Sequence, residues 1–96
     1  MAFENNLSVA VVILNYNGRR YLEQFLPGVI INSPGCEIIV ADNASTDDSV
    51  TFLRTQFPEV RLIILTENFG FCEGYNQALK QVQAKYYVLL NSDVQV

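Results

Sequence analysis

The sequence contains no histidine and only two cysteines, and these absences exclude several catalytic chemistries. Without histidine, the chain cannot build a Ser-His-Asp catalytic triad. Cys36 and Cys72 are too few and too far apart for a zinc site or a disulfide framework. Both cysteines lie among apolar residues, so we expect reduced thiols and a cytoplasmic protein. If the chain is part of a longer protein, we expect that protein in the cytoplasm or at the inner face of the membrane.

Positive charge and long apolar runs are also scarce. Six Lys and Arg residues stand against ten Asp and Glu residues, which gives a net charge of −4. This balance disfavours nucleic acid as a partner. Residues 1–6 end in the polar Glu4, Asn5 and Asn6, and no apolar run approaches ~20 residues. The sequence therefore predicts neither a signal peptide nor a transmembrane helix.

Two glycine-rich nucleotide motifs are absent as well. A dinucleotide-binding loop would need G-x-G-x-x-G after the first strand, where only Gly18 is found. A phosphate-binding P-loop would need Gly-Lys-Ser or Gly-Lys-Thr, and neither occurs in the chain. Any nucleotide site must therefore be of another kind.

Half of the 96 residues are hydrophobic, enough for one small domain spanning residues 1–96. The apolar residues form four continuous runs, which predict strands buried on both faces. Helical spacing links them at residues 21–29, 50–57 and 71–82, with a kink or an early end expected at Pro27-Gly28. The fold class is thus α/β, an open and mostly parallel sheet with flanking helices. Because no helix follows the last run, we expect a truncated domain. The four runs are Val9–Leu14, Ile38–Ala41, Leu62–Leu65 and Tyr86–Leu90.

A cluster of polar residues follows each of the four predicted strands. Each cluster alone is ordinary turn chemistry, since Asn, Asp and Gly favour turns. However, the carboxyl ends of parallel strands share one edge of the sheet, where ligands bind in open α/β folds. Four clusters at one edge therefore predict a binding site. The clusters are residues 15–18, 42–43, 66–68 and 91–93.

The charges of these loops indicate what the site would need to bind a phosphate. The loops are acidic, and Arg19 and Arg20 are the nearby cations. A diphosphate beside Asp42 and Asp93 would need a countercharge, which a divalent cation supplies. Asp93 is a hard oxygen ligand suited to Mg²⁺ or Mn²⁺. Asp42 could instead accept a hydrogen bond from a base imide or a ribose hydroxyl.

Four segments together resemble family 2 glycosyltransferases, and most closely their rhamnosyltransferase-like branch. The order and spacing of the segments match over nearly the whole chain, so the set is specific although each motif is modest. The resemblance implies half of a nucleotide-diphospho-sugar-binding domain of the GT-A fold. The segments are Val11–Gly18, Val40–Ser49, Glu67–Phe71 and Tyr87–Asp93.

The resemblance also implies roles for individual residues. Asp42 would bond the imide of uracil or thymine, and Asp93 would be the metal ligand of the D-x-D position. Asn91 stands where the family has its first acid, which puts ribose contact by a carboxylate in doubt. The implied donor-binding set is Leu14, Asn15, Tyr16, Asn17, Asp42, Asn43, Asn68, Gly70, Phe71, Asn76, Asn91 and Ser92.

The implied reaction is sugar transfer with inversion at the anomeric carbon. The donor would be a UDP-linked or dTDP-linked sugar, and the acceptor of the full protein a saccharide or a lipid-linked acceptor. In this family, the general base lies beyond the D-x-D motif, so we expect it beyond residue 96 and expect this chain alone to transfer no sugar.

Two other readings remain open at this stage. A nucleotidyltransferase also uses a metal and an α/β sheet, and residues 15–20 offer the basic pair it needs but little glycine. A non-enzymatic interaction domain would need its polar loops only as turns.

The last apolar run would form an exposed edge of the sheet, through which another chain can pair. We therefore expect dimers or aggregates through this edge.

Overall fold

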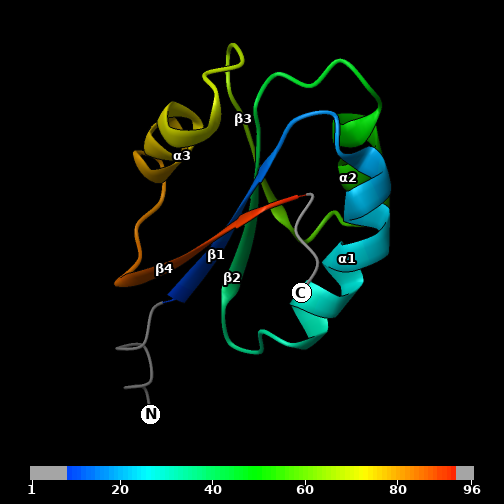
Figure 1. The fold of residues 1–96 in the computed structure, drawn as a ribbon. Coiled ribbons are helices and arrows are strands. Elements are labelled where there is room, and N and C mark those ends of the chain that lie inside the picture. Colours follow the sequence, from blue (N-terminus) through cyan, green and yellow to red (C-terminus); the bar gives the residue numbers. More distant parts are fainter. Residues whose placement is uncertain (1–8, 93–96) are drawn as a thin grey trace.

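The computed structural model describes residues 9–92, in which strands and helices alternate as the sequence predicts (Figure 1). Each predicted strand is present, with its bounds shifted by no more than one residue. The strands are β1 (Val9–Asn15), β2 (Glu37–Asp42), β3 (Arg61–Ile64) and β4 (Tyr86–Asn91). The helices are α1 (Arg19–Ile31), α2 (Ser49–Gln56) and α3 (Phe71–Leu79).

The four strands form one parallel sheet in the order β3-β2-β1-β4. Strand β1 lies in the interior, where Asn15 is in register with Asp42 on β2 and Leu14 is in register with Asn91 on β4. All strand carboxyl ends therefore meet at one edge, which confirms the arrangement that the polar clusters predicted.

Helices cover both faces of the sheet, with α1 and α2 on one face and α3 on the other (Figure 1). Alternate residues of β1 divide between the two cores, because successive side chains of a strand point to opposite faces. Val11 and Ile13 pack with α1 and α2, whereas Val12 and Leu14 pack with α3. This burial on both faces explains the continuous apolar runs of β1 and β2.

Helix α1 corrects one expectation, because it does not end early at Pro27. The helix continues to Ile31 although proline removes one backbone donor. Leu26 and Val29, on either side of Pro27-Gly28, are both buried. Their packing against the sheet holds the helix together across the missing hydrogen bond. No helix within residues 9–92 is both long and apolar enough to cross a membrane.

Strand β4 is the exposed edge that its sequence predicts. It pairs with β1 on one side, and no described strand pairs with the other. Tyr86, Tyr87, Val88 and Leu89 are between 40% and 58% exposed although they are apolar or aromatic. The association that we expect through this edge stays a prediction.

Candidate functional site

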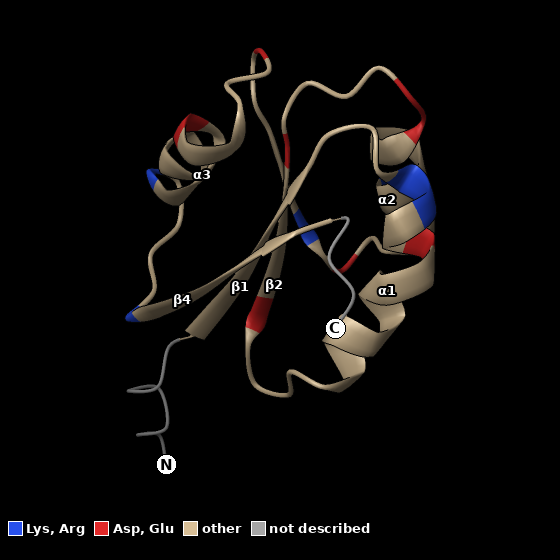
Figure 2. Ribbon diagram, in the orientation of Figure 1, with Lys and Arg blue, Asp and Glu red and all other residues tan. Residues whose placement is uncertain are grey.

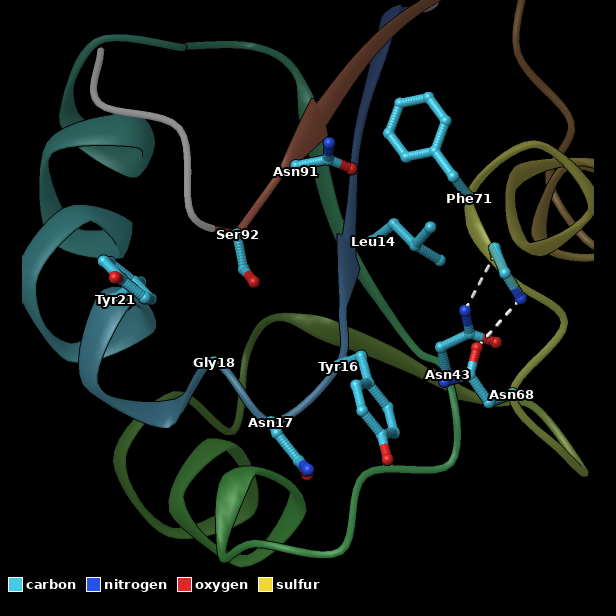
Figure 3. Close-up of a pocket in the computed structure, with 11 residues that line it drawn as sticks. Leu14, Tyr16, Asn17, Gly18, Tyr21, Asn43, Asn68, Phe71, Asn91 and Ser92 are labelled. Carbon is cyan, nitrogen blue, oxygen red and sulfur yellow. Dashed lines mark hydrogen bonds between the residues drawn. The ribbon is translucent and has the colours of Figure 1, made fainter.

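A pocket of about 310 Å³ opens at the carboxyl edge of the sheet (Figure 3). Its walls come from the ends of β1, β2 and β4, from the start of α1, and from the loop that leads into α3. Tyr16 and Phe71 are 47% and 58% exposed, so two aromatic rings are open to a ligand. The lining residues are Leu14, Tyr16, Asn17, Gly18, Tyr21, Asn43, Asn68, Gly70, Phe71, Asn91 and Ser92.

Most of the predicted donor-binding residues line this pocket, and two further lining residues were not predicted. Gly18 belongs to the first polar cluster, and its place in that cluster was the available signal. Tyr21 was assigned to the apolar face of α1, but its ring is 46% exposed and lies 6.2 Å from that of Phe25. Helical spacing alone does not tell a residue at the end of a buried face from one at the rim of a pocket.

Asn15 and Asp42, which were predicted to contact the donor, lie beneath the pocket and do not line it. Their exposed fractions are 0% and 1%. The Asn15 amide donates to Asp42 Oδ1 at 2.9 Å, and the Ser45 hydroxyl donates to the same oxygen at 2.7 Å. Asp42 Oδ2 accepts the Ser45 backbone N–H at 2.8 Å. Direct contact between Asp42 and a base therefore requires this network to open.

Asn17 connects the loop after β1 to the loop that precedes α2. Its backbone has a φ of 52°, a left-handed conformation that asparagine tolerates. Its Oδ1 accepts the backbone N–H groups of Thr46 and Asp47 at 2.7 and 3.1 Å. The Asn17 side chain is thus largely used within the protein.

Asp47 holds the start of α2 rather than a ligand. Its Oδ1 accepts the Ser49 backbone N–H at 2.9 Å, and its Oδ2 accepts the Arg19 N–H at 3.3 Å. Partial burial opposes the charged form, but the hydrogen bonds from Ser49 and Arg19 outweigh it and lower the pKa of Asp47. The Asp47 carboxylate therefore has a structural role at the start of α2.

Asn43 connects the end of β2 to the loop before α3. Its Oδ1 accepts the Phe69 N–H at 2.9 Å, and its Nδ2 donates to the Gly70 carbonyl at 3.0 Å. Asn68 Oδ1 accepts the Gly70 N–H at 2.8 Å within the same loop (Figure 3). These hydrogen bonds fix one wall of the pocket.

The end of β4 forms the opposite wall. The Tyr75 hydroxyl donates to the Leu90 carbonyl and lies 3.0 Å from Asn91 Oδ1, so it holds the strand end from below. Ser92 packs closely on Gly18. A Cβ added at Gly18 would lie 2.4 Å from Ser92 Oγ. Glycine at position 18 therefore lets the first loop and the end of β4 meet.

Asn76 was predicted to bind the donor, but it lies outside the pocket. It lines a neighbouring hollow of about 440 Å³ between α3 and β4, to which Phe71 and Asn91 also belong. Its amide lies 3.5 Å from the Glu73 carboxylate one turn earlier. Asn76 therefore shares a hollow with Phe71 and Asn91 but does not join the other predicted residues.

The pocket itself is uncharged, because none of its described lining residues is acidic or basic. Arg19 lies 3.2 Å from Glu23 and 3.8 Å from Asp48, and its guanidinium stacks 4.6 Å from the centre of the Phe52 ring. These contacts direct Arg19 to the groove between α1 and α2. Figure 2 shows the basic residues of α1 at the start of the helix, next to α2.

The predicted metal ligand, Asp93, lies outside the described residues. Among residues 9–92, no cluster of three or more Asp, Glu, Cys or His side chains is arranged to hold a metal ion. The uncharged walls do not repel a diphosphate, and a metal ion bound together with it would need the Asp93 carboxylate as its ligand.

Known proteins with similar sequences are glycosyltransferases. The putative teichuronic acid biosynthesis glycosyltransferase TuaG of Bacillus subtilis (strain 168) is 33% identical over 90 residues, which are 88% of this chain and 35% of TuaG. The uncharacterized glycosyltransferase YfnE of the same organism is 31% identical over 92% of this chain and 24% of its own length. The chain thus spans about a third or less of these relatives.

Solved structures with the same fold are also glycosyltransferases. The mannosyltransferase PcManGT from Pyrobaculum calidifontis, in complex with GDP-Man and Mn²⁺, has a TM-score of 0.73 and 26% identity over 88% of this chain and 27% of its own. S. aureus TarS 1-349 has a TM-score of 0.76 over 90% of this chain and 27% of its own, and its 24% identity supports the fold alone. The sheet is therefore of the GT-A type.

A family-wide comparison covers a similar part of the chain. The sequence profile of glycosyl transferase family 2 matches residues 10–96, which include all four strands except the first residue of β1, and the loops that build the pocket. The chain belongs to glycosyl transferase family 2.

Proposed function

We propose that this chain binds the nucleoside diphosphate of a nucleotide-sugar donor, together with a divalent metal, as the donor half of an inverting glycosyltransferase. The observation that carries the proposal is the uncharged, partly aromatic pocket at the carboxyl edge of a GT-A sheet. Ligands of open α/β folds bind at this edge. The family membership supports a nucleotide sugar over the other nucleotides that such a sheet can hold.

The exposed ring of Tyr16 is the residue best placed to stack on the base. It follows β1 directly and is 47% exposed at the pocket wall. Stacking of a base on an aromatic side chain is worth about 1–3 kcal/mol. We propose uracil or thymine as the base. Since PcManGT was solved with a guanosine nucleotide, GDP belongs in every comparison.

The metal in this proposal is Mg²⁺ or Mn²⁺, held by Asp93, and Asn91 and Ser92 approach the donor from the strand end just before it. When bound, the metal neutralises the departing diphosphate as a Lewis acid. The Mn²⁺ in the PcManGT complex supports a metal in this fold. Asn91 would bond a donor hydroxyl with its amide, more weakly than a carboxylate would.

The whole protein's acceptor and location extend the proposal. We propose a saccharide or a lipid-linked saccharide as acceptor, within polysaccharide biosynthesis in the cytoplasm or at the inner face of the membrane. The name of TuaG, which refers to teichuronic acid biosynthesis, supports a role of this class.

Titration calorimetry with UDP, dTDP and GDP in the presence of Mn²⁺ tests the donor site. We expect a pyrimidine diphosphate to bind at least about tenfold more tightly than GDP, which corresponds to ~1.4 kcal/mol. Asp93→Ala should abolish the binding. Asp48→Ala removes the same charge from an exposed position that does not line the pocket and should leave the affinity unchanged. Failure of folded wild-type protein to bind any of the three would refute the donor site.

A further inference from the structure

The side chain of Asn43 is buried at the base of the pocket wall, with only 2% of its surface exposed. Its backbone N–H donates to the Asn15 carbonyl at 2.8 Å, which fixes the residue to the end of β1. Its side-chain amide then contacts a different segment, the loop before α3, through both Oδ1 and Nδ2. Asn43 thus links two strand ends to one loop.

The loop that Asn43 contacts carries a large part of the pocket. Asn68, Gly70 and Phe71 all line it. Gly70 has a φ of 80° and a ψ of −169°, a conformation that is essentially restricted to glycine. Because such a backbone is unfavourable without support, the surrounding contacts determine whether the loop keeps its shape.

The Gly70 carbonyl is where that support converges. It accepts the Asn43 amide at 3.0 Å and the Gly74 N–H of the first turn of α3 at 3.1 Å. Helix α3 has no side-chain hydrogen bond at its N-cap. It also packs closely here, since an added Cβ on Gly74 would lie 3.0 Å from Asn43 Nδ2. The Asn43 amide therefore sets both the loop and the start of the helix.

We infer that Asn43 is a positioning residue for donor binding, which acts through the backbone of Phe69 and Gly70 to hold the Asn68–Phe71 wall in its ligand-binding shape. This inference rests on the proposed function and assigns Asn43 a role other than direct recognition. An asparagine suits this role, since its amide offers one acceptor and one donor in the same plane.

The two hydrogen bonds from the Asn43 side chain to Phe69 and Gly70 are called the clasp below. The clasp is tested first without any ligand, by hydrogen exchange in wild-type protein and in Asn43→Ala. The Phe69 amide should be protected in the wild type, and Asn43→Ala should accelerate its exchange by roughly tenfold or more. The amides of β1 should remain protected in the same variant. A wild-type Phe69 amide that exchanges as fast as an unstructured loop would overturn the clasp, even if no variant folds.

The link to donor binding is tested with Asn43→Asp and UDP in the presence of Mn²⁺. When protonated, the introduced carboxyl can still donate to the Gly70 carbonyl. When ionised, it faces that carbonyl without a proton, and burial raises its pKa above the usual range. The UDP dissociation constant of the variant, divided by that of the wild type, should therefore be near one at low pH. It should rise to roughly tenfold as the pH passes the raised pKa.

Asn32→Asp is the matched control, because Asn32 ends α1 away from the pocket and the substitution adds the same charge. The UDP dissociation constant of Asn32→Asp, divided by that of the wild type, should stay near one at every pH. Asp42, Glu67 and Glu73, the acids on the segments that the clasp joins, are present in all three proteins, so the introduced carboxyl is the only difference in acidic groups between each variant and the wild type. Equal UDP affinity for the wild type, Asn43→Asp and Asn43→Ala at every pH would overturn the inference.

The two proposals fail in different ways. If the wild type binds none of UDP, dTDP and GDP, the proposed function is refuted and with it the role of Asn43 in donor binding, while the exchange difference at Phe69 still decides the clasp. If the wild type binds UDP and the Asn43 variants bind it equally well, only the positioning role is refuted.

Discussion

At the residue scale, a polar residue at a strand end of this site has one of two roles: it faces a ligand, or it joins loops to one another. The side chains of Asn15, Asn17 and Asn43 hydrogen-bond to neighbouring loops and hold them in place. The sequence indicates polar residues at the strand ends but cannot separate those that face a ligand from those that join loops. Only the geometry shows that Asn15 is fully buried while Tyr16, the next residue, is half exposed.

Gly18 is the residue whose substitution should most directly disturb the pocket. A Cβ at this position would lie 2.4 Å from Ser92 Oγ and 2.5 Å from Asn15 Oδ1. Because Asn15 is buried, Gly18→Ala should lower the free energy of unfolding by about 1–3 kcal/mol. Gly28→Ala is the control, since nothing lies within 4 Å of its added Cβ. That change should stabilise helix α1 by roughly 0.5–1 kcal/mol. Urea unfolding of both variants checks the difference, and an unchanged stability in Gly18→Ala would contradict the close packing.

Asp42 should matter for stability whether or not a donor is bound. An amide has one acceptor oxygen, so in Asp42→Asn the introduced N–H₂ group would oppose a donor from Asn15 or Ser45. Leaving that buried donor unsatisfied should cost about 1–3 kcal/mol of unfolding free energy. Asp48→Asn, at an exposed position, should stay within about 0.5 kcal/mol of the wild type. A stabilised Asp42→Asn variant would indicate that like-charge repulsion outweighs these hydrogen bonds.

At the element scale, β1 and β2 could be predicted to within one residue because most of their side chains are buried on both faces of the sheet. The apolar run of β4 predicted its strand equally well although that strand is exposed. A strand covered on both sides needs apolar residues at every position, and such runs end where burial ends. The end of α1 could not be predicted in this way. Pro27 predicts a break from local chemistry, whereas the burial of Leu26 and Val29 is a tertiary effect that overrides it.

Strand β4 is the element through which the chain should self-associate. Its outer edge has no described partner strand, and Val88 is 46% exposed at its centre. Light scattering of the wild type at increasing concentration should therefore show dimers or larger species. Val88→Lys should remove them, because a charge on an edge strand discourages pairing. Ile31→Lys adds the same charge at a 76% exposed position on α1 and should not. A wild type that remains monomeric at high concentration would contradict the prediction.

At the scale of the whole molecule, the sequence predicted where the site lies better than how it is built. Parallel strands with polar carboxyl ends require a shared edge, so the location of the pocket followed from the pattern alone. The burial of Asp42 did not follow from it, because it depends on the parallel register that sets Asp42 beside Asn15. The position of Asn76 outside the pocket likewise depends on how α3 packs on the sheet.

The central claim is that a divalent metal allows this uncharged pocket to hold a nucleoside diphosphate. The most direct test compares the affinity of the wild type for UDP in Mn²⁺ with its affinity in a chelator. The account predicts binding at least about tenfold tighter with Mn²⁺, a difference of ~1.4 kcal/mol. Equal affinity in the two solutions would contradict it.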